Sequence, residues 1–234
     1  MNKILFPISV DSDNFRTEIV LNGLTQILAD TEGFVFLIAD SLQIYNKAKQ
    51  IISGKPFDKI ISEFRERNKY FEERIIWLDK LAIQLGINTN EIKWDYCKAE
   101  TMCDKYFYRI YKLLLINYHT DAKFKSDIED AATVQLKRHM SNIDDRELIL
   151  NTLYILEEIA LNLRVKLWNQ LNFEYYIGNY HLPLIRLYSG EYNLSISDIC
   201  NKSDNIDFRF FEGFIDKENQ VEWKENTPGN TRYS

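Results

Sequence analysis

The chain has 234 residues, of which 45% are hydrophobic; this is enough for one sizeable α/β domain and too short for two ordinary domains with a linker. We therefore expect one domain over residues 1–225 and a loose polar tail over 226–234. The net charge of −6 argues against broad binding to nucleic acid, because such binding depends on lysine and arginine. We expect no DNA partner, but this charge still allows a local basic surface.

The sequence also argues against a membrane segment and a metal site. No apolar run reaches the roughly 18 residues of a membrane-spanning helix, and we expect no signal peptide either. The three cysteines lack CxxC spacing, and the three histidines form neither an HExxH motif nor an i, i+4 pair. We therefore expect a cytoplasmic protein without a metal. We also expect a monomer without a cofactor.

The first third of the chain alternates between strand and helix patterns. A mostly apolar run over 4–9, which contains Pro7 and Ser9, and an unbroken apolar run over 34–39 predict two buried strands. Each is followed by apolar residues at helical spacing. This βαβα order predicts a parallel sheet. A long helix is predicted from Gly54 to about Leu85, where Gly86 ends it.

The same patterns continue towards the C-terminus. Asp144, with Glu147 three residues later, forms a capping-box pattern that begins a helix continuing through Leu163. The other predicted elements are a strand over 91–96, an aromatic-rich helix around 106–111, a polar helix near 121–140 and a strand over 173–177.

Ser9 is the first candidate for chemistry, because it ends the first predicted strand. Open parallel sheets place their ligands at the carboxyl ends of their strands. The alternative is that Ser9 turns the chain or caps the next helix, although Ser12, Asp13 and Asn14 could serve as that cap. No GxSxG motif surrounds Ser9 and no histidine shows a triad signature, so a serine hydrolase has little support.

Two further groups of residues could take part. Tyr154 and Glu158 lie four residues apart and share one face of a helix, where a buried carboxylate would suit a substrate ammonium group. The alternative is that Glu157 and Glu158 form a solvated pair. Tyr180 and His181 follow a predicted strand, and Tyr180 could relay a proton, although most of the 14 tyrosines must serve packing.

Together these motifs resemble the cyclodipeptide synthase family. Its members carry a serine after the first strand, a Tyr-x-x-x-Glu helix and a later Tyr-His-x-Pro segment, and the order and spacing agree here over roughly 4–190. The family resembles the catalytic domain of tyrosyl- and tryptophanyl-tRNA synthetases, which implies a Rossmann-like α/β fold with a central, mostly parallel sheet flanked by helices. This chain has neither His-x-Gly-His nor Lys-Met-Ser-Lys-Ser, the motifs that a synthetase needs for adenylate formation.

The resemblance implies an aminoacyltransferase. It would take aminoacyl groups from two aminoacyl-tRNAs in succession and close them into a cyclic dipeptide, a 2,5-diketopiperazine. Ser9 would carry the acyl ester, and Tyr154 and Glu158 would hold the ammonium of the first aminoacyl group. Tyr180, assisted by His181, would relay the proton for ring closure.

The resemblance also implies where substrate and tRNA bind. Leu5 and Leu37 are candidate walls for an apolar first side chain, the alternative being plain sheet core. Pro7 and Ser12 stand where the family often has glycine and asparagine, and Ala160 replaces the usual proline after the Tyr-x-x-x-Glu motif, which implies an altered pocket. The basic face of the long helix would meet tRNA phosphates, the alternative being a solvated face; its residues are Arg65, Arg67, Lys69 and Arg74.

Two other functions stay open on the sequence. One is a non-catalytic Rossmann-like module that binds a nucleotide or tRNA. The other, with less support, is a serine hydrolase.

Overall fold

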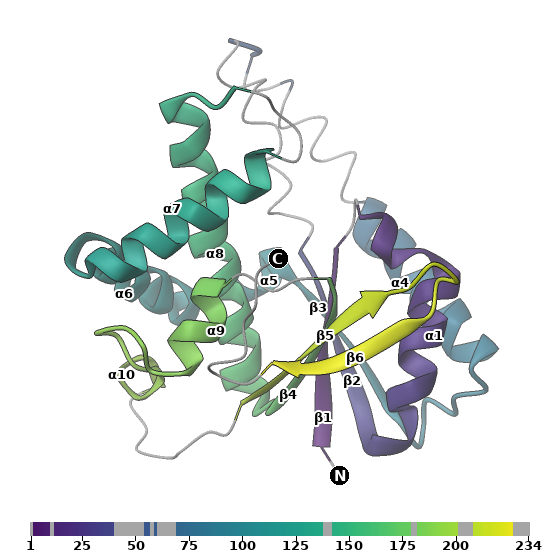
Figure 1. The fold of residues 1–234 in the computed structure, drawn as a ribbon. Helices are drawn as coiled ribbons and strands as arrows, with labels where there is room; N and C mark the ends of the chain where they lie inside the picture. The colour runs from purple at the N-terminus through teal and green to yellow at the C-terminus, as the bar shows by residue number, and fades with distance from the viewer. Residues whose placement is uncertain are drawn as a thin grey trace.

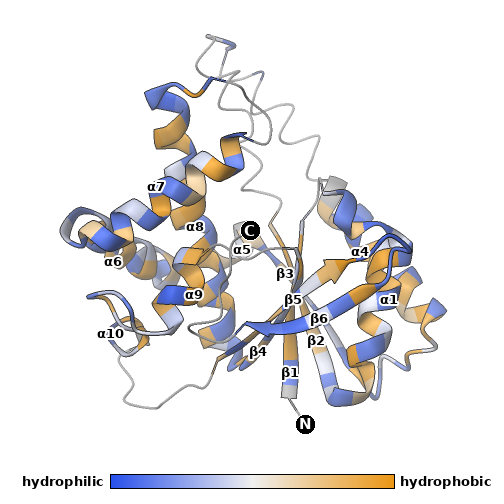
Figure 2. Cartoon of the chain, in the orientation of Figure 1, coloured by the Kyte–Doolittle hydropathy of each residue, from blue (hydrophilic) through white to orange (hydrophobic). Residues whose placement is uncertain are grey.

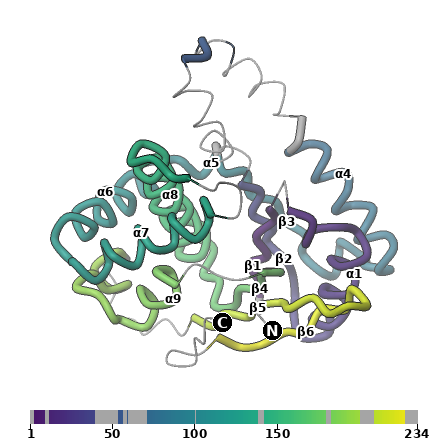
Figure 3. The backbone as a smooth tube through the Cα atoms, turned by 45° about the horizontal axis from the view of Figure 1, so that its top comes forward, coloured from purple at the N-terminus to yellow at the C-terminus, as the bar shows by residue number. Residues whose placement is uncertain are grey.

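The computed structural model describes residues 2–9, 12–39, 54–56, 59, 69–137, 142–178, 182–200 and 208–226. In this part of the chain, one sheet separates two groups of helices: α1 and α4 cover one face, and α6 to α9 cover the other (Figure 1). A second view shows the same separation (Figure 3). The predicted α/β fold with a mostly parallel, helix-flanked sheet is confirmed.

The sheet has six strands in the order β3-β2-β1-β4-β5-β6. All neighbours run parallel except β6, which is antiparallel to β5. The strands are β1 (Asn2–Ile8), β2 (Thr31–Ile38), β3 (Lys93–Lys98), β4 (Phe173–Ile177), β5 (Arg209–Ile215) and β6 (Val221–Asn226).

Alternate residues of β1 fill two hydrophobic cores, because successive side chains of a strand point to opposite faces. Ile4, Phe6 and Ile8 pack with α1 (Thr17–Ile27) and α4 (Lys69–Gln84). Leu5 packs on the opposite face with the larger helical layer. The apolar runs of β1 and β2 therefore reflect burial on both faces. In contrast, the edge strand β6 is mostly hydrophilic in colour (Figure 2).

The larger layer is built around α8. This helix packs against α6 and α7, and its residues between Ile159 and Lys166 are all buried. The predicted capping box at Asp144 is confirmed, since Asp144 accepts from the Glu147 amide and the Glu147 carboxylate accepts from the Asp144 amide. The helices of this layer are α5 (Ala99–Met102), α6 (Lys105–Thr120), α7 (Ala122–Lys137), α8 (Asp145–Asn169), α9 (Leu182–Tyr188) and α10 (Ile196–Cys200).

Some boundaries differ from the predicted ones. Helix α8 continues to Asn169, beyond the predicted Leu163, and its residues are buried as far as Lys166. The end of α4 is as predicted: Gly86 adopts φ 67°, which glycine tolerates, and the Ile87 amide donates to the Ala82 carbonyl. Most of the predicted first half of that helix lies outside the described residues. So do residues 227–234 of the predicted tail, whereas Asn226 is the last residue of β6.

Candidate functional site

The carboxyl end of β1 lies at the switch point of the sheet. Strand β1 lies where the strand order reverses, with β2 on one side and β4 on the other. β1 pairs with β2 as far as Ile8 and Ile38. Its pairing with β4 is shorter and covers two positions, Ile4 with Phe173 and Leu5 with Glu174. Open α/β sheets bind their ligands at such a switch point. The partly exposed Ser9 follows β1 directly at this place.

The segment after β1 is tied to the end of β4. Ser12 Oγ accepts a hydrogen bond from the Asn14 amide, so Ser12 is the cap of the short 3-10 turn η1 (Asp13–Phe15), as the sequence allowed. The Phe15 ring packs against Tyr176 of β4 at 5.6 Å between centroids. The Asn14 amide group reaches the Ile177 carbonyl at 3.5 Å. These contacts join the segment after β1 to the end of β4.

Tyr154 and Glu158 come together on α8, as their spacing predicts. Burial, the charges of Glu158 and Tyr176, and a hydrogen bond to the Glu158 carboxylate raise the pKa of Tyr154 well above its usual value. The phenol therefore stays protonated at neutral pH and donates to the carboxylate. Glu157 and Glu158 are both partly exposed.

Gln135 belongs to the same group, and the sequence analysis missed it. Its side chain hydrogen-bonds with Tyr154, and its Oε1 accepts from Asn151 Nδ2 at 3.2 Å. Asn151 Nδ2 also donates to the Ala132 carbonyl at 2.9 Å, which fixes the amide that orients Gln135. No local motif marks Gln135, because it reaches the site from α7 through the packing of α7 on α8.

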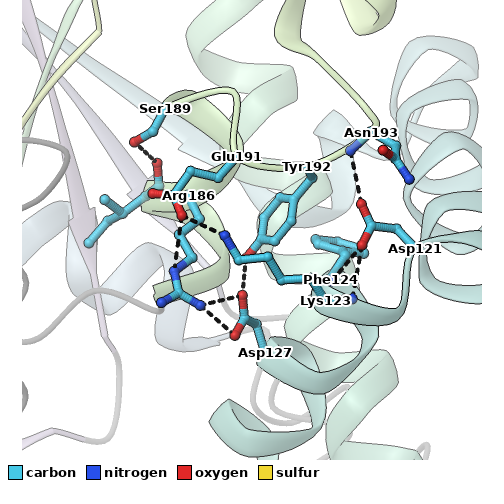
Figure 4. A network of polar contacts seen from close by, with 10 residues as sticks. Asp121, Lys123, Phe124, Asp127, Arg186, Ser189, Glu191, Tyr192 and Asn193 are labelled. Carbon is cyan, nitrogen blue, oxygen red and sulfur yellow. Dashed lines mark hydrogen bonds and ion pairs between the residues drawn. The ribbon is translucent and has the colours of Figure 1, made fainter.

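Tyr180 and His181 lie outside the described residues, but both flanks of their segment are described. On the β4 side, the Gly178 amide donates to the Gly213 carbonyl at 3.1 Å. On the other side, α9 is anchored to α7 because Arg186 binds both Asp127 carboxylate oxygens at 2.6 Å (Figure 4). Tyr192 donates to the same carboxylate at 2.7 Å.

The predicted pocket walls lie on the α8 side of the sheet. Leu5 and Leu37 belong to the hydrophobic cluster that Tyr154 also contacts, and their exposed fractions are 0% and 4%. Both are sheet core in this structure, which was the alternative for them. Pro7, which pairs with Leu37, is partly exposed. Their role as walls of a substrate pocket stays a prediction.

Of the predicted tRNA-binding side chains, Arg74 is the one whose position is described. Arg65 and Arg67 lie outside the described residues, as does the side chain of Lys69 at the start of α4. The Arg74 guanidinium lies 5.0 Å from the Trp77 ring centre, and Trp77 Nε1 donates to Thr17 Oγ1 at 3.0 Å. A depression of about 510 Å³ joins Arg74 to the segment after β1; it is lined by Ser12, Asp13, Phe15, Arg16, Thr17, Glu18, Arg74 and Trp77.

Within the described part of the chain, no group of three or more His, Cys, Asp or Glu side chains could hold a metal ion. None of the described helices combines the length and the apolar character needed to cross a membrane.

No model of a known protein family and no curated protein sequence matches this chain. Its structure, however, is similar to solved cyclodipeptide synthases. A synthase of this kind from Fluoribacter dumoffii is 17% identical with a TM-score of 0.72, over 97% of this chain and 91% of that one. AlbC, a cyclodipeptide synthase from Streptomyces noursei, is 14% identical with a TM-score of 0.56, over 78% of this chain and 85% of that one.

A third similar structure is a Mycobacterium tuberculosis protein that relates cyclodipeptide synthetases to type I tRNA synthetases. It is 14% identical with a TM-score of 0.59, over 80% of this chain and 78% of that one. The chain therefore has the Rossmann-like fold of solved cyclodipeptide synthases, as the sequence resemblance implies.

Proposed function

We propose that this protein is a tRNA-dependent cyclodipeptide synthase. The observation that supports this most directly is the position of Ser9, at the switch point of a sheet whose fold is that of solved cyclodipeptide synthases. The Tyr154–Glu158 pair on α8 supports it further, since a phenol and a carboxylate held together suit an ammonium group. We also propose that the chain acts as one domain and as a monomer in the cytoplasm, without a cofactor.

The first step is an exchange of esters. Ser9 Oγ attacks the ester carbonyl of the first aminoacyl-tRNA, the ribose oxygen of the tRNA leaves, and the serine proton passes to that oxygen. An aminoacyl ester is already activated, so orientation contributes more than a strong base. Glu158 supplies the negative charge that holds the ammonium, and Tyr154 and Gln135 fix the direction of the carboxylate.

The second step forms two amide bonds. The amine of the second aminoacyl group attacks the acyl-Ser9 ester and releases the serine, or the equivalent dipeptidyl-enzyme forms. The remaining amine then attacks the last ester and closes the ring, and the ribose oxygen of the second tRNA, or Ser9 Oγ in the dipeptidyl-enzyme, leaves. Tyr180, assisted by His181, carries the amine proton to that oxygen. Phosphates of the tRNA bind Arg74 beside the segment after β1, and bind Arg65, Arg67 and Lys69 earlier in the chain.

Product analysis tests this function. We expect cultures that express the protein to contain cyclic dipeptides detectable by mass spectrometry, while cultures that carry an empty vector do not. A non-catalytic binding module would leave no such product. A serine hydrolase would leave none either, but would turn over simple aryl esters rapidly.

Glu158→Gln tests how the ammonium is held. The variant keeps the shape and an acceptor for Tyr154 but removes the charge, which is worth about 1.5–3 kcal/mol in a charge-assisted hydrogen bond. We expect acylation of the enzyme to slow by about one to two orders of magnitude, measured from the rate of adduct formation with charged tRNA. Glu157→Gln is the matched control, because its charge acts on Tyr111 instead. Equal rates for the two variants would contradict the assignment.

A further inference from the structure

Helix α6 presents an aromatic and basic surface. The helix contains no Asp or Glu, although the chain as a whole carries a net charge of −6. Trp168, near the end of α8, adjoins this surface through its contact with Tyr106. We call it the α6 face; its exposed residues are Lys105, Tyr106, Tyr108, Arg109, Lys112 and Trp168.

Two aromatic rings of the α6 face are held in place by an arginine. The rings of Tyr106 and Trp168 lie 4.9 Å apart, with exposed fractions of 39% and 58%. The Arg164 guanidinium lies 4.3 Å from the Trp168 ring centre and 5.6 Å from that of Tyr106. Arg164 is fixed in turn by Asp104, through contacts of 3.0 and 2.6 Å. The rings therefore form a platform that is already ordered before any partner binds.

The combination of ordered rings and cations fits one kind of partner. Unpaired nucleotides offer flat bases, which stack on aromatic rings, and phosphates, which bind lysine and arginine. The core of a protein–protein interface is depleted of lysine, and a membrane-surface helix keeps its apolar face apart from its lysines, whereas rings and cations alternate on the α6 face. Lys105 stands at the edge of the platform, with its ammonium 5.0 Å from the Tyr106 ring centre, where it can meet a phosphate beside a stacked base.

We propose that the α6 face binds unpaired nucleotides of the tRNA substrate. This inference rests on the proposed function, because that function makes tRNA the RNA partner. The α6 face is separate from the depression at Arg74, since α6 and α4 cover opposite faces of the sheet (Figure 1). An aminoacyl-tRNA whose ester lies at Ser9 would then be held from both sides of the sheet.

Two pairs of substitutions separate stacking from charge. Tyr106→Leu with Trp168→Leu removes the aromatic faces but keeps apolar cover over Arg164, and we expect affinity for tRNA to fall about tenfold with an unchanged salt dependence. Lys105→Gln with Lys112→Gln removes two charges, and we expect the slope of log affinity against log salt to fall by about 1.4. Lys217→Gln with Lys224→Gln, in the β5–β6 hairpin, is the matched control and should change neither.

Affinity is measured by fluorescence anisotropy with a labelled, unacylated tRNA transcript, between about 50 and 200 mM salt. If the aromatic variant unfolds, the salt dependence of the lysine variant still tests whether the α6 face binds tRNA. Unchanged affinity and slope in both α6 variants, with tRNA still bound and product still formed, would overturn this inference and leave the proposed function standing. Loss of self-association in the variants, with tRNA affinity unchanged, would show instead that the α6 face joins two copies of the chain.

Discussion

Substituting Ser9 by alanine is expected to abolish both the covalent intermediate and the cyclic product. The proposed mechanism must store the first aminoacyl group while one tRNA leaves and another enters, and the hydroxyl of Ser9 is the group that stores it. The variant should fold normally, because Ser12 rather than Ser9 caps the turn that follows β1. Even the loss of a cap would cost only about 1 kcal/mol.

Intact-protein mass spectrometry after mixing with charged tRNA gives the measurement. We expect one aminoacyl mass on the unsubstituted protein, mapped by digestion to the peptide that contains Ser9, and no added mass on Ser9→Ala. Ser126→Ala is the matched control, since it removes one exposed hydroxyl from α7. An undiminished adduct on Ser9→Ala, or full product formation by that variant, would contradict the acyl-serine mechanism.

The central strands are predictable from the sequence because a strand that is buried on both faces consists mostly of consecutive apolar residues. The predicted runs at 4–9 and 34–39 correspond to β1 and β2, and the run at 173–177 matches β4. The hairpin of β5 and β6 was not predicted. The sequence of β6 is Val-Glu-Trp-Lys-Glu-Asn, and its side chains point alternately to the two faces of the sheet. The face with Val221 and Trp223 is the more buried one. Such a short, polar edge strand becomes recognisable only when it pairs with β5.

Glycine in β5 shows why this pairing escapes sequence patterns. Gly213 lies opposite Trp223, and a Cβ added there would stand 2.9 Å from both the Trp223 ring and Val221. The glycine is therefore required by a contact with another strand. In the sequence alone, it reads as an interruption of a strand.

The candidate site likewise contains residues that the sequence predicts and residues that it does not. Tyr154 and Glu158 were predictable because both lie on one helix, where residues four apart share a face. Gln135 was not, because it comes from α7 and no rule of spacing relates it to Tyr154. The contact between Phe15 and Tyr176 likewise depends on how β1 and β4 pair. Local motifs predict the parts of a site within one element, and tertiary packing supplies the others.

The ion pair between Lys166 and Glu174 is a further contact that could not be predicted, because the sequence does not show that these two residues meet inside the protein. Both side chains are fully buried, with 3.1 Å between Lys166 Nζ and Glu174 Oε2, and Asn162 donates to Glu174 Oε1 at 2.6 Å. Burial lowers the pKa of Lys166, and the carboxylate of Glu174 opposes that shift. Glu174 also pairs with Leu5, so this ion pair lies where β4 joins β1.

Glu174→Ala should therefore destabilise the protein strongly. It leaves a buried ammonium and the Asn162 amide without an acceptor, and breaking a buried pair from one side costs about 3–5 kcal/mol of the free energy of unfolding. Glu222→Ala breaks an exposed pair with Lys224 and should cost less than about 1 kcal/mol. Urea unfolding followed by tryptophan fluorescence measures both values.

A double substitution separates the loss of the pair from the stranding of one charge. Lys166→Met with Glu174→Leu removes both charges and fills similar volume, and such replacements are often neutral or stabilising. The Lys166 ammonium lies 4.0 Å from the centre of the Phe210 ring, so the thioether that replaces it would enter a site already lined by an aromatic surface. We expect the double variant to recover most of the stability that Glu174→Ala loses. If it is as unstable as Glu174→Ala, packing at β4 rather than the uncompensated charge causes the loss.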